Sequence, residues 1–263
     1  MRAPIGPQRI VCLTEEPTEI LYTLGEGERI VGISAYTVRP SEAKQEKPVV
    51  SAFIDGSVHK ICALKPDLII GFSDIQADLA RKLIAANQQV LIFNQRSLQE
   101  ILEVILAIGS LVGRQLEAVQ LCDRYLRRLE SIQTQNANRY ERPRVYFEEW
   151  DEPMISGIQW VSELIDIAGG RDIFSDRARG KLAKERFVQA EEVIEAQPDI
   201  VFASWCGKPF DSVAFRARPG FDRLPAVQKD QIHEVPSELI LQPGPACLTA
   251  GLDHLIEGLR TAL

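Results

Sequence analysis

The sequence predicts an α/β protein in which two similar parallel-sheet lobes are joined by a single long α-helix. Three observations support this: a repeated segment, strands that alternate with helices on both sides of it, and an amphipathic helix in the middle of the chain. At 263 residues, 45% of them hydrophobic, the chain is long enough for two modest lobes. We expect an N-terminal lobe at 1–114, a bridging segment at 115–140 and a C-terminal lobe at 141–263, with a ligand cleft between the lobes.

The repeated segment combines the end of a helix with the start of a buried strand. Ala63–Phe72 reads ALKPDLIIGF and returns at Glu195–Trp205 as EAQPDIVFASW. The proline ends the preceding helix, because the residue before a proline disfavours the α conformation. The apolar run after the aspartate is typical of a strand buried on both faces. Strands that start at Arg9 and Arg144 have almost the same offset as this repeat, which indicates two lobes of similar build.

Strands and helices alternate along both lobes, and this predicts parallel sheets with helices on both faces. In the first lobe we expect strands at 9–13, 29–33, 67–71 and 89–93, helices at 17–24, 58–64, 76–86 and 97–112, and a long loop at 35–57. In the second we expect strands at 144–148, 199–203 and 231–235, helices at 159–168, 190–196 and 246–262, and loops at 150–158, 171–188 and 204–218.

One amphipathic helix is expected between the lobes, from Gln115 to about Asn138. Its apolar residues recur at spacings of three and four and predict a single apolar stripe: Leu116, Val119, Cys122, Leu126, Leu129 and Ile132. A helix of this length is a rod of roughly 36 Å.

Composition and motifs exclude several classes of function. With 30 basic and 37 acidic residues the net charge is −7, and no long basic cluster is present, so we expect no nucleic-acid partner. The apolar runs are too short to span a bilayer. The N-terminus lacks the pattern of a secretory signal, so the protein is either cytoplasmic or the product of signal removal.

Motifs for catalysis and for metal binding are also absent. The five cysteines are widely spaced and form no CxxC pair, which argues against a zinc site or a disulfide framework. His59, His233 and His254 lie far apart, and ordinary surface or core histidines explain them better than a three-histidine metal site. No nucleophile, phosphate-binding or metalloprotease motif occurs. We expect no catalytic residue, no metal and no cofactor, and hence a protein that is not an enzyme.

Aromatic residues gather where the predicted strands end, which is where open α/β sheets bind ligands. Phe72, Trp150 and Trp205 follow three strands, Tyr36 and Phe53 lie in the loop after a fourth, and Trp160 lies beside another expected cleft loop. Such side chains suit a large, partly apolar ligand, although each could instead cap the core of its lobe. The acidic run 148–152 either receives hydrogen bonds from ligand amides or is a solvated loop.

Several segments resemble the cobalamin-binding proteins of ABC importers. They are Ile10–Leu21, Val31–Tyr36, the ALKPDLII run, Met154–Gly157 and the helix ending Ala168-Gly169-Gly170. The likeness extends from Arg9 to the last helix and is specific for the helical-backbone class of substrate-binding proteins, which also bind haem and iron–siderophores. It implies a protein that binds a corrinoid in the cleft without transforming it. It also implies an extracytoplasmic location and the membrane subunits of an ABC importer as partners, and we expect a monomer.

The resemblance also implies roles for individual residues. Family pocket aromatics fall on Tyr36, Phe53 and Phe72, and a further pocket position falls on Met154. Family members present one glutamate per lobe to arginines of the transporter; Glu191 matches one, and the other position holds His59. Before the last helix this chain has Leu239–Gln242 where the family has a Trp-Phe-Glu-Arg-like segment, so the pocket floor differs. The alternatives are a haem or ferric-siderophore binder of the same class, and a cytoplasmic corrinoid chaperone, sensor or enzyme that reuses the fold.

Overall fold

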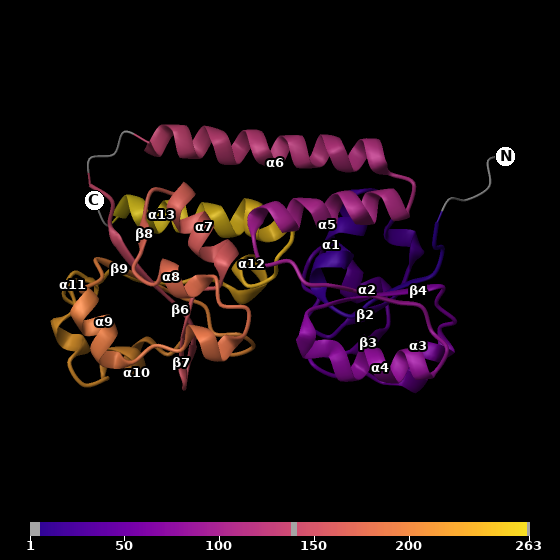
Figure 1. The fold of residues 1–263 in the computed structure, drawn as a ribbon, viewed down its shortest axis with the longest axis horizontal. Helices are drawn as coiled ribbons and strands as arrows, with labels where there is room; N and C mark the ends of the chain where they lie inside the picture. The colour runs from indigo at the N-terminus through magenta and orange to yellow at the C-terminus, as the bar shows by residue number, and fades with distance from the viewer. Residues whose placement is uncertain (1–5, 138–140, 262–263) are drawn as a thin grey trace. The chain divides into compact units, whose positions relative to one another are not determined.

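The computed structural model describes residues 6–137 and 141–261 of the chain (Figure 1). It divides into two compact units. The N-terminal unit comprises Met1–Gln95 and Gln99–Arg124, and the C-terminal unit comprises Arg96–Leu98 and Tyr125–Leu263. The division falls inside the long helix α6 (Gln115–Asn136). Residues 138–140, where the bridging segment was expected to end, lie outside the described residues.

The N-terminal unit is built on a five-stranded parallel sheet in the order β3-β2-β1-β4-β5. Helices α1 and α5 lie on one face of this sheet and α3 and α4 on the other (Figure 1). The strands are β1 (Ile10–Cys12), β2 (Ile30–Ser34), β3 (Val49–Ser51), β4 (Leu68–Phe72) and β5 (Val90–Phe93). The helices are α1 (Glu15–Thr23), α2 (Ala43–Glu46), α3 (Val58–Ala63), α4 (Ala77–Ala85) and α5 (Leu98–Leu111), with short 3-10 turns at Gly27–Arg29 and Asp74–Gln76.

The C-terminal unit has β6 (Arg144–Asp151) at the centre of a second sheet in the order β10-β9-β6-β7. Along the other edge of β6, β8 pairs with its first residues and β7 with its last. In Figure 1, α7 and α13 lie on one face of the sheet and α9, α10 and α11 on the other. The other strands are β7 (Met154–Ser156), β8 (Arg171–Asp172), β9 (Ile200–Ala203) and β10 (Ile232–Glu234). The helices are α7 (Gln159–Ile167), α8 (Ser175–Ala178), α9 (Ala190–Ala196), α10 (Ser212–Arg216), α11 (Pro225–Gln228), α12 (Ser237–Ile240), a π-helical turn at Cys247–Gly251, and α13 (Leu252–Thr261), with 3-10 turns at Ala183–Arg186 and Phe221–Arg223.

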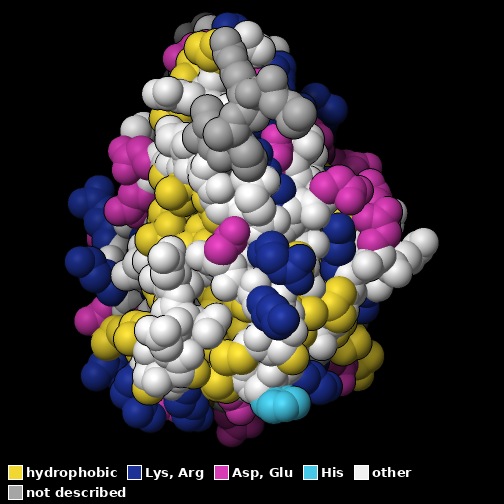
Figure 2. Space-filling model, turned by 90° about the vertical axis from the view of Figure 1, so that its right-hand side faces the viewer, with side chains coloured by type: hydrophobic (Ala, Val, Ile, Leu, Met, Phe, Trp, Pro, Cys, Tyr) yellow, Lys and Arg dark blue, Asp and Glu magenta, His cyan; other side chains and the backbone are white. Residues whose placement is uncertain are grey.

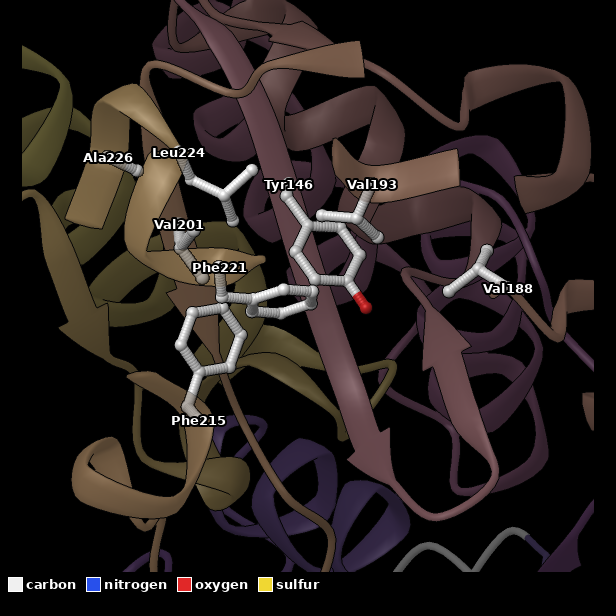
Figure 3. Close-up of a cluster of buried hydrophobic side chains, with 8 residues drawn as sticks. All are labelled: Tyr146, Val188, Val193, Val201, Phe215, Phe221, Leu224 and Ala226. Carbon is white, nitrogen blue, oxygen red and sulfur yellow. The ribbon is translucent and has the colours of Figure 1, made fainter. Parts of the chain in front are cut away.

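Each unit encloses its own hydrophobic core, because the apolar strand residues are covered on both faces of the sheet. In the N-terminal unit Val11, Leu13 and Ile69 pack with Leu79 and Leu83 of α4. The corresponding cluster of the C-terminal unit is drawn in Figure 3 and contains Tyr146, Val188, Val193, Val201, Phe215, Phe221, Leu224 and Ala226.

The two copies of the Pro-Asp segment build the same local structure in the two units. The backbone N–H groups of Gln8 and Arg9 donate to the carboxylate of Asp67, over 2.7 and 2.9 Å. The N–H of Arg144 donates to Asp199 over 2.9 Å, and the Arg144 guanidinium adds bonds of 3.0 and 2.9 Å to the same carboxylate. In both units this aspartate joins the first strand of the sheet to the strand that follows the proline. The prediction of two similar parallel-sheet units is therefore confirmed.

Several segments expected to be loops contain regular structure. The expected loop 35–57 contains α2 and β3, and 150–158 contains the end of β6 and the antiparallel strand β7. Strand β8 and helix α8 lie within 171–188, and α10 lies within 204–218. The expected helix 246–262 begins with the π-helical turn, and its residue 262 lies outside the described part. All of these elements are short, so hydrophobic periodicity does not mark them.

The buried face of α6 also differs from the expected stripe. Its buried residues are Ala118, Leu121, Cys122, Tyr125 and Leu129. Leu116, Val119 and Leu126 are exposed. The predicted apolar stripe was wrong at these three positions. Spacings of three and four residues between apolar side chains are compatible with two neighbouring faces of a helix, and only one of these faces is buried.

The surface shown in Figure 2 carries acidic and basic side chains interspersed, with hydrophobic side chains between them. No helix in the described ranges is long and apolar enough to cross a membrane.

Candidate functional site

In the N-terminal unit, two predicted site residues meet at the ends of β2 and β3. The rings of Tyr36 and Phe53 pack edge to face, with centroids 6.3 Å apart and planes at 78°. Tyr36 is 47% exposed and Phe53 half-buried, so this pair offers an accessible aromatic surface. The Phe53 carbonyl accepts a hydrogen bond of 3.0 Å from the side-chain amide of Gln76, which is fully buried. The loop is therefore fixed to the interior of its own unit.

The segment after Tyr36 is held by carboxylates of α1. The backbone N–H groups of Val38 and Arg39 donate to Glu15 Oε1 over 2.9 and 3.2 Å. The Arg39 side chain donates to Glu19 over 3.0 Å. Because β1 ends at Cys12 and α1 begins at Glu15, these acids lie at the carboxyl end of the central strand.

These carboxyls are buried, and burial changes their protonation. Glu15 and Glu16 are 2% and 1% exposed. Burial raises the pKa of Glu15 to about 8, with the neighbouring Glu16 and Glu19 adding to the rise and the two backbone N–H groups opposing it. Burial likewise raises the pKa of Glu16 to about 7. A carboxyl with such a pKa changes charge near neutral pH.

The sequence predicts Phe72 directly after strand 67–71, but the residue lies within the strand. It is the last residue of β4, and its side chain is 6% exposed. Its N–H donates to Gln76 Oε1 over 3.0 Å. Phe72 therefore packs in the core of its unit, because β4 runs one residue longer than expected.

In the C-terminal unit, Glu148 is the centre of a buried polar network near the end of β6. It has no exposed surface, and its carboxylate accepts hydrogen bonds from Trp205 Nε1 at 3.0 Å and Tyr146 Oη at 2.9 Å. The Arg218 guanidinium adds two bonds of 2.5 and 3.0 Å. Burial and the Glu148 carboxylate raise the pKa of the Tyr146 phenol well above its usual value, so it remains a donor. In Figure 3 the Tyr146 hydroxyl lies at the margin of the hydrophobic cluster.

The other acids of the 148–152 run are also paired, apart from the exposed Glu152. Arg186, 3% exposed, binds Glu149 with distances of 2.5 and 3.1 Å, and also donates to the Ser156 carbonyl over 2.6 Å. The ammonium of Lys208 lies 2.7 Å from both carboxylate oxygens of Asp151. Three of the four acids of the run therefore lie in β6 and are each paired with a cation of the same unit, and only Glu152 lies beyond the strand and is exposed.

The ammonium group of Lys208 contacts the rings of both Trp150 and Trp205. The ammonium nitrogen is 4.4 Å from the ring centroid of Trp150 and 4.6 Å from that of Trp205, within the range of a cation–π contact. Trp205 is 5% exposed and also packs edge to face on Phe210, with centroids 4.9 Å apart. Trp150 is half-buried and belongs to β6 itself, since this strand extends to Asp151.

Trp160 and Met154 both pack against other residues of the C-terminal unit. Trp160 is the second residue of α7 and 2% exposed, and its indole N–H donates to the Ile240 carbonyl over 2.8 Å. The expected loop 150–158 directly precedes it, but the helix directs the indole into the core of the unit. Met154 begins β7, is half-buried and packs against the cluster of Figure 3.

The two predicted docking residues occupy equivalent positions of the repeat. His59 is the second residue of α3 and Glu191 the second residue of α9, and both are exposed. Each of these helices leads into a Pro-Asp strand.

A separate cavity of about 510 Å³ in the C-terminal unit contains none of the predicted site residues. Its acids have partners within the unit: Glu163 accepts from the Leu98 N–H over 2.8 Å, and Asp166 pairs with Arg142 at 2.5 Å. Within residues 6–137 and 141–261, no cluster of histidine, cysteine, aspartate and glutamate side chains is arranged to hold a metal ion.

Sequence reasoning missed the residues that compensate the acids at the strand ends. Arg218, Lys208 and Arg186 lie in segments for which the sequence predicts loops, and Glu15 and Glu16 lie in a segment that the sequence marks only by its family resemblance. One indication was available: several carboxylates in a strand that is otherwise buried require cations nearby.

Comparison with known proteins places the chain in a family. A family model described as periplasmic binding protein matches residues 10–239. A Bacillus subtilis protein named an uncharacterized ABC transporter substrate-binding lipoprotein, YvrC, is 26% identical over 96% of this chain and 80% of its own length. A vitamin B12-binding protein of Vibrio cholerae is 29% identical over 94% of this chain and 87% of its own.

Solved structures show the same fold. The periplasmic vitamin B12 binding protein of Vibrio cholerae matches with a TM-score of 0.75 and 26% identity, covering 98% of this chain and 99% of its own. The haem-binding protein RhuT of Roseiflexus matches with a TM-score of 0.79 at 23% identity, covering 97% and 100%, a likeness that shows the fold alone. The matched family consists of non-enzymatic substrate-binding proteins. Since its model spans nearly the whole chain, this protein belongs to the periplasmic binding protein family.

Proposed function

We propose that this protein is the substrate-binding component of an ABC importer and that its ligand is a corrinoid of the cobalamin type. The observation that carries the proposal is the 29% identity, over 94% of the chain, to a protein named for vitamin B12 binding. The similarity to an ABC transporter substrate-binding lipoprotein over 96% of the chain supports the importer role. The same relatives favour an extracytoplasmic location and membrane subunits of an importer as partners.

The chemistry of the strand ends supports a ligand of this kind. A corrinoid is large and flat and carries many neutral amide groups, so it is bound by aromatic contact and by hydrogen bonds. We propose that Tyr36, Phe53 and Trp150 contact it, with Met154 contributing apolar surface.

The charges of the site favour a corrinoid over an anionic siderophore. A ferric siderophore with several negative charges is best held by unpaired arginines or lysines. Arg39 is paired with Glu19, and Arg186 with Glu149. Because these charges are compensated within each unit, the strand ends suit a ligand that is close to neutral.

A titration followed by visible absorption and tryptophan fluorescence tests the proposal. Cyanocobalamin, dicyanocobinamide and hemin are each added to the purified protein. We expect saturable binding of the corrinoids with one ligand per chain, and a dissociation constant in the micromolar range or below. Saturable binding of hemin alone, or of none of the three at about 100 μM, would reject the corrinoid assignment.

A further inference from the structure

The three ion pairs of the β6 acids differ in how readily they can open. Arg218 and Arg186 bind their carboxylates with two nitrogens each, and their side chains are 18% and 3% exposed. Lys208 is 38% exposed and reaches Asp151 through a single ammonium group. A partly exposed lysine pair is weak and geometrically permissive, whereas a buried bidentate arginine pair is not. The Lys208–Asp151 pair is therefore the exchangeable one.

This pair lies on the aromatic surface proposed to contact the ligand. The ammonium is 4.4 Å from the ring centroid of the half-buried Trp150 and 4.6 Å from that of the buried Trp205, so it covers part of the Trp150 ring. A flat ligand that packs on the Trp150 ring must either displace Lys208 or make it part of the contact. The lysine stem allows the second outcome, because its four methylene groups can stay on the rings while the ammonium moves.

Opening the pair exposes one donor and one acceptor, and each then needs a new partner. Asp151 is 24% exposed and would need hydrogen-bond donors to replace the ammonium, since an unpaired, partly buried carboxylate is costly. Lys208 would need an anionic oxygen. A ligand with both amide N–H groups and a phosphodiester satisfies both residues. A ligand with carboxylates but without peripheral N–H donors leaves Asp151 unpaired.

We propose that Lys208 is a specificity-determining residue that exchanges Asp151 for the phosphodiester of a complete corrinoid, while Asp151 receives hydrogen bonds from the ligand's amides. This inference rests on the proposed function. It states a preference within the corrinoids: cobalamin, which carries the phosphodiester, over cobinamide, which lacks it.

The test measures the affinities of cyanocobalamin and dicyanocobinamide for wild type, Lys208→Gln and Lys181→Gln. Lys181 is an exposed lysine of the same unit outside the aromatic surface and is the matched control. We expect Lys208→Gln to weaken cobalamin binding at least about fivefold, as for loss of a charge-assisted hydrogen bond, and cobinamide binding less than about twofold. Lys181→Gln should change neither. In wild type, added salt should weaken cobalamin binding more than cobinamide binding.

The outcomes separate this inference from the function on which it rests. If wild type binds both corrinoids and Lys208→Gln weakens both equally, strengthens either or changes neither, the exchange is wrong while the corrinoid function stands. If wild type binds neither ligand, both proposals fail. The melting temperature of Lys208→Gln should stay within a few degrees of wild type, because the pair is partly exposed; a larger loss with equal effects on both ligands assigns Lys208 a structural role.

Discussion

Lys65 and Gln197 adopt the same left-handed backbone conformation, each with a φ of 49°, directly before the prolines of the two repeated segments. Residues other than glycine rarely adopt this conformation. Here it ends α3 and α9 and redirects the chain so that Asp67 and Asp199 reach the first strand of each sheet. The two units therefore share a specific turn and not merely a class of fold.

The aspartates of this turn should be important for stability. Replacing Asp199 by alanine removes three hydrogen bonds to Arg144, and we expect the free energy of unfolding to fall by about 2 kcal/mol. Asp67→Ala should cost less, because Asp67 accepts two backbone bonds and none from the arginine side chain. Urea denaturation followed by circular dichroism measures both. Equal losses in the two variants would show that the Arg144 side chain contributes nothing.

Acid should weaken the second turn. The hydrogen bonds from Arg144 lower the pKa of Asp199, so its contribution is present above the carboxyl's unfolded pKa and is lost as the pH falls through the lowered value. We expect wild type to lose more stability than Asp199→Asn when the pH falls from about 6 to about 3. Thermal melting across this range measures the difference, and parallel curves for the two proteins would contradict it.

The buried acids of α1 predict the opposite dependence near neutral pH. With pKa values of about 8 for Glu15 and about 7 for Glu16, against 4.5 when unfolded, the folded protein binds more protons than the unfolded chain. The stability of these groups is fully present below about pH 4.5 and is lost as the pH rises through 7 to 8. We expect the melting temperature to fall between about pH 5 and pH 8.5 by several degrees.

The variant Glu15→Gln isolates that effect. Glutamine keeps an oxygen for the N–H groups of Val38 and Arg39 but does not titrate. The melting temperature of Glu15→Gln should depend less on pH than that of wild type. Cys12, whose pKa burial raises to about 12, stays protonated through this range and does not produce the slope. An unchanged slope in Glu15→Gln would contradict the buried-acid account.

Two tryptophan variants separate core from ligand surface. Trp160→Phe leaves the Ile240 carbonyl without its donor and a space beside the ring, so we expect a loss of about 2 kcal/mol in stability and unchanged corrinoid affinity. Trp150→Phe should do the reverse: a loss below about 1 kcal/mol and weaker binding, since this ring is half-buried. Urea denaturation and ligand titration of both variants provide the comparison. Weakened binding in Trp160→Phe at unchanged stability would show that Trp160 contacts the ligand.

The docking residues give a prediction about the transporter. The family resemblance implies paired glutamates that meet arginines, and His59 stands where the second one is expected. His59→Glu should strengthen association with a vitamin B12 importer in detergent several-fold at low salt, and Glu191→Gln should weaken it. A pull-down at two salt concentrations measures both. If His59→Glu binds no better than wild type, that position is not a docking contact.

The sequence predicted the parts of the fold that hydrophobic patterns and proline encode. The long strands, the major helices and the repeat all follow from local chemistry. It did not predict β7 or β8, which are two or three residues long and exist only through pairing with β6.

For the candidate site, residue type was predictable and surroundings were not. Phe72 and Trp160 are aromatic residues of the kind that contact ligands. Their side chains are buried because Phe72 lies within β4 and α7 directs Trp160 into the core. Glu148 and Lys208 gain their importance from partners 70 and 57 residues away, Arg218 and Asp151. Such pairings depend on tertiary structure, which no local pattern of the sequence reports.

The position of the unit boundary inside α6 limits how this protein can be cut. Separation between Arg124 and Tyr125 would leave helical fragments of about ten residues, which are marginal in water because helix nucleation is costly. Each fragment would also expose its share of the buried face, Leu121 in one and Leu129 in the other. Split reporters and circular permutants built on this protein therefore need new termini outside α6, such as in the turn around Asn87 between α4 and β5, which is exposed to solvent.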